Sequence, residues 1–150
     1  MGVYLNPGNV DFQEVLNSKI YVDKSELIQY TNSVLRTTQK YICVSRPRRF
    51  GKSMAANMLT AYYSRGCDSR EMFQGLKIAK HTDFEKHLNQ YNVIHLNMQD
   101  YLTESENMKQ LIQFVEEDLL DELQQEFADL RMPRRKTLVK VLEQAFAQYK

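Results

Sequence analysis

Residues 41–44 (Tyr-Ile-Cys-Val) are apolar at every position, and a polar, basic stretch follows them at once at residues 45–53. A short run without polar alternation is typical of a strand buried on both faces, as in a parallel sheet covered by helices. Beyond the basic stretch, apolar residues recur at helical spacing: Met54, Met58, Leu59 and Tyr62. The sequence therefore predicts a strand, a loop and a helix in that order.

The rest of the chain repeats this alternation. Residues 20–22 (Ile-Tyr-Val) and 93–96 (Val-Ile-His-Leu) predict two further strands. A helix is predicted from Asp23 to about residues 34–36, because an acidic residue followed by Glu26 three positions later is a helix-start signature. A capping box at residues 103–106 predicts a long helix with this apolar stripe: Met108, Leu111, Ile112, Val115, Leu119, Leu123 and Phe127. A last helix is predicted after Pro133, with the stripe Leu138, Val141, Leu142, Ala145 and Phe146.

Composition limits the classes of protein to consider. A chain of 150 residues with 43% hydrophobic and 26% charged residues is typical of one globular domain, or part of one. Its apolar runs are too short for a membrane span, and its first ten residues show no secretory signal. The two cysteines, Cys43 and Cys67, are interpreted as reduced thiols. We therefore expect a cytoplasmic protein with no membrane partner.

The charge is distributed unevenly along the chain. Residues 1–80 carry 12 Lys/Arg and 6 Asp/Glu, a net charge of +6, whereas residues 81–150 carry 8 and 13, a net charge of −5. A basic first half favours an anionic ligand there, and an acidic second half argues against wrapping the whole domain around nucleic acid. Simple segregation of surface charges explains the same pattern, and the sequence does not decide between the two.

The end of the basic stretch matches most of a phosphate-binding loop, which has the pattern G-x-x-x-x-G-K-[ST] between a strand and a helix. Gly51 would let the backbone approach the phosphates, Lys52 would bring a positive charge to them, and the Ser53 hydroxyl would ligate Mg²⁺. One position departs from the pattern, because Arg46 stands where the first glycine is expected. The alternative is a basic turn at a helix start with a solvated lysine.

Together these elements predict an α/β fold of the P-loop NTPase kind, with three layers in αβα order. The predicted strands are too few for a finished parallel sheet, so we expect the sheet to be incomplete.

Four segments of the chain, in order, resemble the bacterial and archaeal AAA-ATPase-like family. Residues 45–54 (SRPRRFGKSM) resemble the family signature R-P-R-R-F-G-K-S, which replaces the ordinary Walker A loop. Residues 20–28 are similar to its Y-V-D-K-T-x-L-I element, and residues 73–78 to its F-x-G-L-x-I segment. Residues 91–96 are similar to its Y-P-V-I-x-L strand, with Asn92 where proline is usual. In this family an arginine at position 46 is a regular feature.

The resemblance implies a site, cofactors and a domain organisation. It implies that ATP and Mg²⁺ bind at Arg46, Arg48, Arg49, Phe50, Gly51, Lys52, Ser53 and Met54, with the Ser53 hydroxyl on the metal. It also implies a Walker B strand ending in Asp-Glu, and often a C-terminal PD-(D/E)XK nuclease-like domain. Neither is recognisable within residues 1–150. We therefore expect the chain to be the N-terminal part of this architecture and to hydrolyse ATP slowly or not at all.

Several roles stay open at this point. Arg48 and Arg49 would contact the γ-phosphate or pair with carboxylates, and Asp23 and Lys24 would lie near the nucleotide base or cap the helix that follows. The chain as a whole is a nucleotide-binding protein or, alternatively, a nucleic-acid-binding or interaction module. The nucleic-acid alternative would use Arg46, Arg48, Arg49, Arg65 and Arg70. An incomplete sheet with an open edge would also allow self-association.

Overall fold

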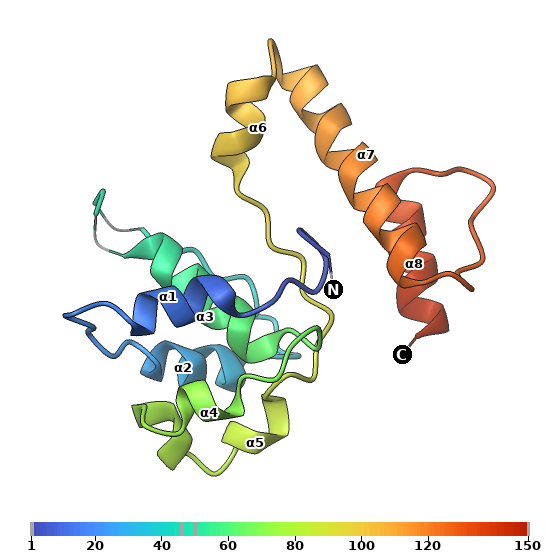
Figure 1. Ribbon diagram of the computed structural model, residues 1–150. Helices are drawn as coiled ribbons and strands as arrows, with labels where there is room; N and C mark the ends of the chain where they lie inside the picture. The colour runs from blue at the N-terminus through green and yellow to red at the C-terminus, as the bar shows by residue number, and fades with distance from the viewer. Residues whose placement is uncertain (1, 46, 50, 150) are drawn as a thin grey trace. The chain divides into compact units, whose positions relative to one another are not determined.

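The computed structural model describes residues 2–45, 47–49 and 51–149 (Figure 1). The chain forms two compact units. The central unit is Asn6–Val93, and the terminal unit combines Met1–Leu5 with Ile94–Lys150. The chain therefore leaves the terminal unit after five residues, builds the central unit, and then returns.

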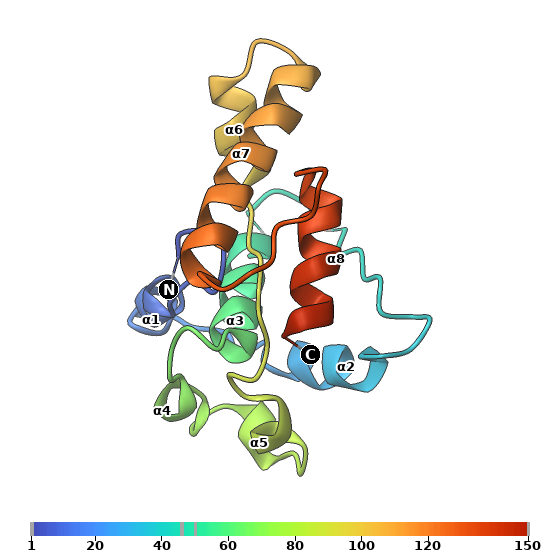
Figure 2. The ribbon, with the colours of Figure 1, turned by 90° about the vertical axis from the view of Figure 1, so that its right-hand side faces the viewer.

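The central unit is built from short helices (Figures 1 and 2). They are α1 (Val10–Leu16), α2 (Glu26–Val34), α3 (Lys52–Tyr63), α4 (Arg70–Phe73), the 3₁₀ helix η1 (Lys77–Lys80) and α5 (Phe84–His87). The predicted helices after Asp23 and after Gly51 are confirmed as α2 and α3. Helix α3 packs against α1, and α2 packs against η1.

Aromatic side chains from four of these elements form the centre of the core. Phe73 is completely buried, and its ring lies 5.1 Å from the ring of Phe12 and 5.5 Å from that of Tyr62, between ring centroids. Phe84 and the aliphatic residues Ile28 and Met58 complete the same cluster. Because Phe12, Tyr62, Phe73 and Phe84 come from α1, α3, α4 and α5, this cluster ties the short helices together.

The terminal unit contains α6 (Met98–Glu104), α7 (Met108–Glu126) and α8 (Leu138–Gln148), with α7 packed against both of the others (Figure 2). The two predicted long helices are confirmed as α7 and α8. The predicted capping box at residues 103–106 is wrong, because Thr103 and Glu104 belong to the end of α6. Asn107 caps α7 instead: its side-chain oxygen accepts a hydrogen bond of 3.0 Å from the amide of Gln110.

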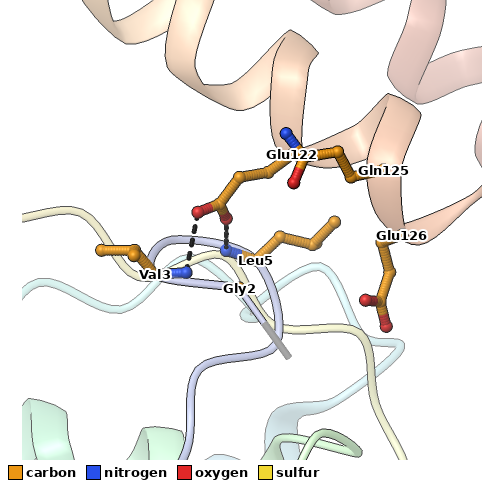
Figure 3. Close-up of a pocket in the computed structure, with 6 residues that line it drawn as sticks. All are labelled: Gly2, Val3, Leu5, Glu122, Gln125 and Glu126. Carbon is orange, nitrogen blue, oxygen red and sulfur yellow. Dashed lines mark hydrogen bonds between the residues drawn. The ribbon is translucent and has the colours of Figure 1, made fainter.

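A single carboxylate on α7 holds the first residues of the chain (Figure 3). Glu122 accepts hydrogen bonds from the backbone amides of Val3 at 2.7 Å, Tyr4 at 2.9 Å and Leu5 at 2.6 Å. Figure 3 shows the Glu122 side chain pointing toward this segment, with Gln125 and Glu126 on the same helix. The carboxylate therefore fixes Leu5, whose side chain lies in the core of the terminal unit with Leu123 and Val141.

The three-layer αβα fold with a parallel sheet is wrong. In the part of the chain that the structure describes, β pairing is limited to two isolated bridges, Leu5 with Ile94 and Ser64 with Tyr91. Residues 41–44 have no regular secondary structure and are exposed: the exposed fraction is 85% for Tyr41 and 48% for Val44. A buried parallel strand needs neighbours that satisfy its backbone and helices that cover both faces, and the described segments supply neither here.

The other two predicted strands are also wrong as sheet strands. Residues 20–22 form neither helix nor strand, and Ile20 is 84% and Val22 65% exposed. Residues 93–96 contribute only the single antiparallel bridge between Ile94 and Leu5. Among the described residues, no helix is long and apolar enough to cross a lipid bilayer.

Candidate functional site

Helix α3 begins directly after a glycine in a left-handed conformation. Gly51 has φ +74° and ψ +32°, and its carbonyl oxygen accepts the first helical hydrogen bond from the amide of Ala55, at 3.0 Å. A side chain at this φ would be strained, which explains glycine at this position. The left-handed residue turns the chain sharply from the basic loop into α3.

The first turn of α3 has the properties of an anion-binding helix end. The amides of the first residues of a helix have no acceptor within the helix, and here the N-cap is a glycine without a capping side chain. These amides and the helix dipole favour a negative charge in front of Lys52, Ser53 and Met54. All three side chains are exposed. The Lys52 ammonium folds back over the loop and donates a 3.2 Å hydrogen bond to the carbonyl oxygen of Pro47.

Two arginines of the predicted site lie in the described part of the loop. Arg48 and Arg49 are both exposed, and Arg49 has φ +67°, a conformation uncommon for a residue with a side chain. Arg46 and Phe50, also predicted for the site, lie outside the residues that the structure describes. The structure therefore places Arg48, Arg49, Gly51, Lys52, Ser53 and Met54 on one continuous loop and helix start.

A second lysine reaches this loop from a distant part of the sequence. The Lys24 ammonium nitrogen lies 2.7 Å from the point that a Cβ atom on Gly51 would occupy. The Lys24 side chain thus packs against the bare backbone of the glycine, and two lysines meet at the start of α3. From the sequence, Lys24 was expected near the nucleotide base or at the cap of the following helix, and periodicity carries no signal for its contact with Gly51.

Asp23 is not the N-cap of α2, and its other predicted position, near a nucleotide base, stays a prediction. Helix α2 has Ser25 as its N-cap and no capping side-chain hydrogen bond, so Asp23 does not cap it. One Asp23 oxygen accepts from the Ser25 amide and the other from the Lys77 amide, each at 2.8 Å. The Ser25 hydroxyl accepts from the amide of Ile78 at 3.1 Å. Asp23 and Ser25 therefore fasten the segment that carries Lys24 to η1.

These contacts set the charge state of Asp23. Partial burial acts to raise the pKa of Asp23, but the hydrogen bonds from Ser25 and Lys77 and the charge of Lys77 outweigh it, so the pKa lies below its usual value. Because the pKa of Asp23 is lower in the folded state, the charged carboxylate stabilises the fold at pH values above the pKa that Asp23 has in the unfolded chain. That contribution is lost as the pH falls through the folded pKa.

We expect Asp23→Asn to lower the free energy of unfolding of the central unit by about 1–2 kcal/mol at pH 7, because a charged acceptor is replaced by a neutral one. The difference from the unsubstituted protein should shrink at pH 3, where Asp23 itself begins to be protonated. Urea unfolding at both pH values measures this. Asp11→Asn, at an exposed aspartate of α1, is the matched control. An equal difference at both pH values would contradict the assigned role of the charge.

Tyr21, predicted only as part of a strand, has a buried hydroxyl beside the start of α3. Burial raises the pKa of this phenol, and the charge of Asp23 raises it further, whereas the Lys24 backbone lowers it. Tyr21 lines a small crevice together with Val22, Lys24, Met54, Ala55 and Met58. A tyrosine within a predicted aliphatic strand was the available signal, because a phenol needs a polar partner that such a strand does not supply.

The donors present suit phosphate better than they suit a metal held by protein ligands alone. Within the described ranges, no three His, Cys, Asp or Glu side chains converge in a way that would hold a metal ion. The Ser53 hydroxyl is exposed at the start of α3, where a metal carried by a bound phosphate group could reach it. The arrangement can therefore bind an oxyanion through amides and ammonium groups and offers one hydroxyl to an accompanying cation.

Comparison with known families gives a match to a family described as predicted AAA-ATPase (AAA-ATPase-like), over residues 7–150. The match covers both units of the fold and includes the loop and the start of α3. The chain matched none of the curated proteins and none of the solved structures with which it was compared.

Proposed function

The chain belongs to the AAA-ATPase-like family, and from this premise we propose that it binds ATP with Mg²⁺ through residues 46–54. Membership of the family indicates nucleotide binding in general. The geometry at the start of α3 supports the choice of ATP and of this loop.

One observation carries the proposal: a left-handed glycine precedes a helix that begins with lysine, and a second ammonium group packs against that glycine. In the proposed complex, the amides that follow Gly51 donate to phosphate oxygens. Lys52 releases the Pro47 carbonyl and turns to the phosphates. Lys24, whose ammonium group lies beside Gly51, adds a second positive charge. Adjacent phosphate groups carry several negative charges, so two lysines at one helix start suit them well.

The arginines and the serine complete the proposed site. Arg48 and Arg49 extend from the exposed loop, and their planar guanidinium groups suit the oxygens of the terminal phosphate. Mg²⁺, when bound with ATP, would neutralise phosphate charge, and Ser53 is the residue of this chain that would hold it through its hydroxyl.

Calorimetric titration of Mg²⁺-ATP tests the proposal. We expect saturable binding to the unsubstituted protein and affinity at least tenfold weaker for Lys52→Ala, because the variant loses the ammonium in the first turn of α3. The matched control is Lys109→Ala, which removes an exposed lysine from the first turn of α7 and should leave the affinity unchanged. Lys24→Ala should weaken binding severalfold, in keeping with a supporting charge.

Short DNA titrated into the same proteins tests the nucleic-acid alternative. That reading predicts binding that weakens steeply with salt and does not depend on Lys52. Arg70, one of its five arginines, forms an ion pair with Glu85. Salt-dependent DNA binding that is equal in the unsubstituted protein and in Lys52→Ala, without saturable ATP binding, would overturn the nucleotide proposal.

A further inference from the structure

A crevice of about 330 Å³ lies at the C-terminal end of α2, away from the phosphate-binding loop. It is lined by Leu35 and by these polar residues: Asn32, Arg36, Lys86, His87, Gln90 and Tyr91. Its volume is in the range of small-molecule sites. It shares no residue with residues 46–54. The nine residues of α2, about 13 Å in length, separate it from the Lys24 segment.

A polar side chain at the lining is buried and rigidly held. Asn32 is 7% exposed, and its amide nitrogen donates to the Tyr62 hydroxyl at 3.2 Å. Its amide oxygen accepts from the Tyr63 hydroxyl at 2.6 Å, and that hydroxyl also contacts the Thr31 hydroxyl at 2.6 Å. The amide therefore keeps a fixed orientation, as a binding site requires of its polar groups.

The histidine of the crevice is held by its neighbour. Nδ1 of His87 lies 2.6 Å from the Tyr91 hydroxyl, and the two rings stack at 5.9 Å between centroids. The Tyr91 backbone is itself anchored, since its amide donates to the carbonyl oxygen of Tyr63 at 2.9 Å. With Nδ1 engaged by the hydroxyl, Nε2 is the nitrogen of His87 that remains for a ligand.

The charges around the crevice are cationic. Arg36 and Lys86 lie at its exposed edge, and none of its lining residues is acidic. Partial burial is the largest cause that lowers the pKa of His87, and the positive charge of Lys86 is the second. The negative charge of Asp83 acts to raise this pKa, and the positive charge of Arg36 lowers it further. His87 is therefore mainly neutral at pH 7 while two cations stand beside it. The partial negative charge at the end of α2 is small compared with these two formal charges.

We infer that this crevice is a binding site for a small dianionic oxyanion, namely free phosphate or the phosphate group of a small phosphomonoester. Arg36 and Lys86 supply the positive charge. The amide nitrogens of Asn32 and Gln90 already donate one hydrogen bond each, to the Tyr62 hydroxyl and the Leu88 carbonyl oxygen, and the second N–H of each would supply a neutral donor. A dianion between these cations would also favour the protonated form of His87, which would then donate from Nε2. Carboxylates carry one charge and two oxygens, so they should bind more weakly.

Protonation and binding are consequently coupled. A bound dianion raises the pKa of His87, and by reciprocity a falling pH tightens binding of a dianion whose own charge does not change. Sulfate is the suitable probe for this pH dependence because it stays dianionic from pH 5 to pH 8. Phosphate and glycerol phosphate then distinguish the two sources of ligand, because only the ester adds an organic group that can contact Leu35 and Tyr91.

The test is an NMR titration of the three histidine rings, with His87 assigned from the spectrum of His87→Gln. We expect sulfate and phosphate to shift the ring resonances of His87 saturably and to raise its pKa, with little effect on the resonances of His81 or His95. Sulfate should bind at least threefold more tightly at pH 5.5 than at pH 7.5, and acetate at least fivefold more weakly than phosphate. Tighter binding of glycerol phosphate than of phosphate would assign the phosphomonoester; equal binding would assign free phosphate.

A matched pair of double variants separates a built site from general attraction of anions. Arg36→Gln with Lys86→Gln should weaken phosphate binding at least tenfold, whereas Arg65→Gln with Lys19→Gln, an equal change in charge at exposed positions, should not. Equal losses of phosphate affinity in the two double variants, or equal resonance shifts of all three histidines, would overturn the inference. Lys52→Ala should leave the His87 response intact, so failure of the nucleotide proposal and failure of this one are distinguishable.

Discussion

Phe73→Ala should lower the free energy of unfolding of the central unit by about 3–5 kcal/mol, the usual cost of deleting a buried aromatic ring. Phe73 has no exposed surface, and its ring packs against Phe12, Tyr62 and Phe84. Because these partners come from three other helices, the cavity would loosen the whole aromatic cluster. Helices as short as α4 and α5, four residues each, have no stability of their own and depend on this packing.

Hydrogen exchange, followed peptide by peptide, is the measurement of choice because the chain has two units that need not unfold together. Protection should fall across residues 6–93 in Phe73→Ala. The matched control is Phe146→Ala on α8, where the side chain is 71% exposed, and the same substitution should change protection by less than about 0.5 kcal/mol. Equal effects of the two substitutions would contradict the described core.

Glu122→Ala should destabilise the terminal unit by about 3 kcal/mol. The substitution removes a charged acceptor shared by three backbone amides, those of Val3, Tyr4 and Leu5, and hydrogen bonds to charged groups are among the stronger ones. Released from Glu122, the first residues would no longer hold Leu5 in the core beside Leu123. Glu122→Gln keeps the shape of the side chain and one acceptor oxygen, so this variant should lose less stability than the alanine variant.

Thermal unfolding combined with hydrogen exchange of residues 2–5 and 94–149 measures this effect. Glu116→Ala is the control, since it removes a partly buried glutamate from the same helix. A result in which Glu122→Ala and Glu116→Ala are equally stable would mean that the carboxylate does not hold the N-terminal segment.

The helices were predictable because their signals are local. The apolar stripe of α7 follows the 3.6-residue period, and Leu111, Leu119 and Leu123 of this stripe are buried, whereas Met108 and Ile112 are exposed. The start of α7 was misplaced because Thr103 and Asn107 are both good caps four residues apart, and only the ending of α6 at Glu104 decides between them.

The strands were not predictable from the same kind of evidence. Tyr41 and Val44 have strand propensity, but a sheet requires pairing between particular segments, and propensity does not indicate which segments pair. In the described structure these residues stay exposed, while Ile94 pairs with Leu5, nearly ninety positions away in the sequence. An apolar run alone indicates neither that Tyr41 and Val44 stay exposed nor that Ile94 pairs with Leu5.

Part of the candidate site was likewise predictable from the sequence, and part was not. Gly51 and Lys52 were predicted from their spacing, and the left-handed φ of Gly51 is a conformation that favours glycine. The approach of Lys24 to Gly51 and the buried hydroxyl of Tyr21 depend on how the segment before α2 lies, which Asp23 fixes through a contact with Lys77. Such long-range contacts leave no pattern in a single sequence.

The two ends of the central unit meet. Asn6 donates from its amide to the Val93 carbonyl oxygen at 2.7 Å, the Val93 amide donates back to the Asn6 side chain at 2.9 Å, and the side chains of Asn6 and Asn92 are hydrogen-bonded at 2.9 Å. A segment whose ends are clasped in this way behaves as a cassette. The backbone therefore enters and leaves the central unit at one place, an arrangement that lets a segment be inserted into a loop without stretching the chain on either side.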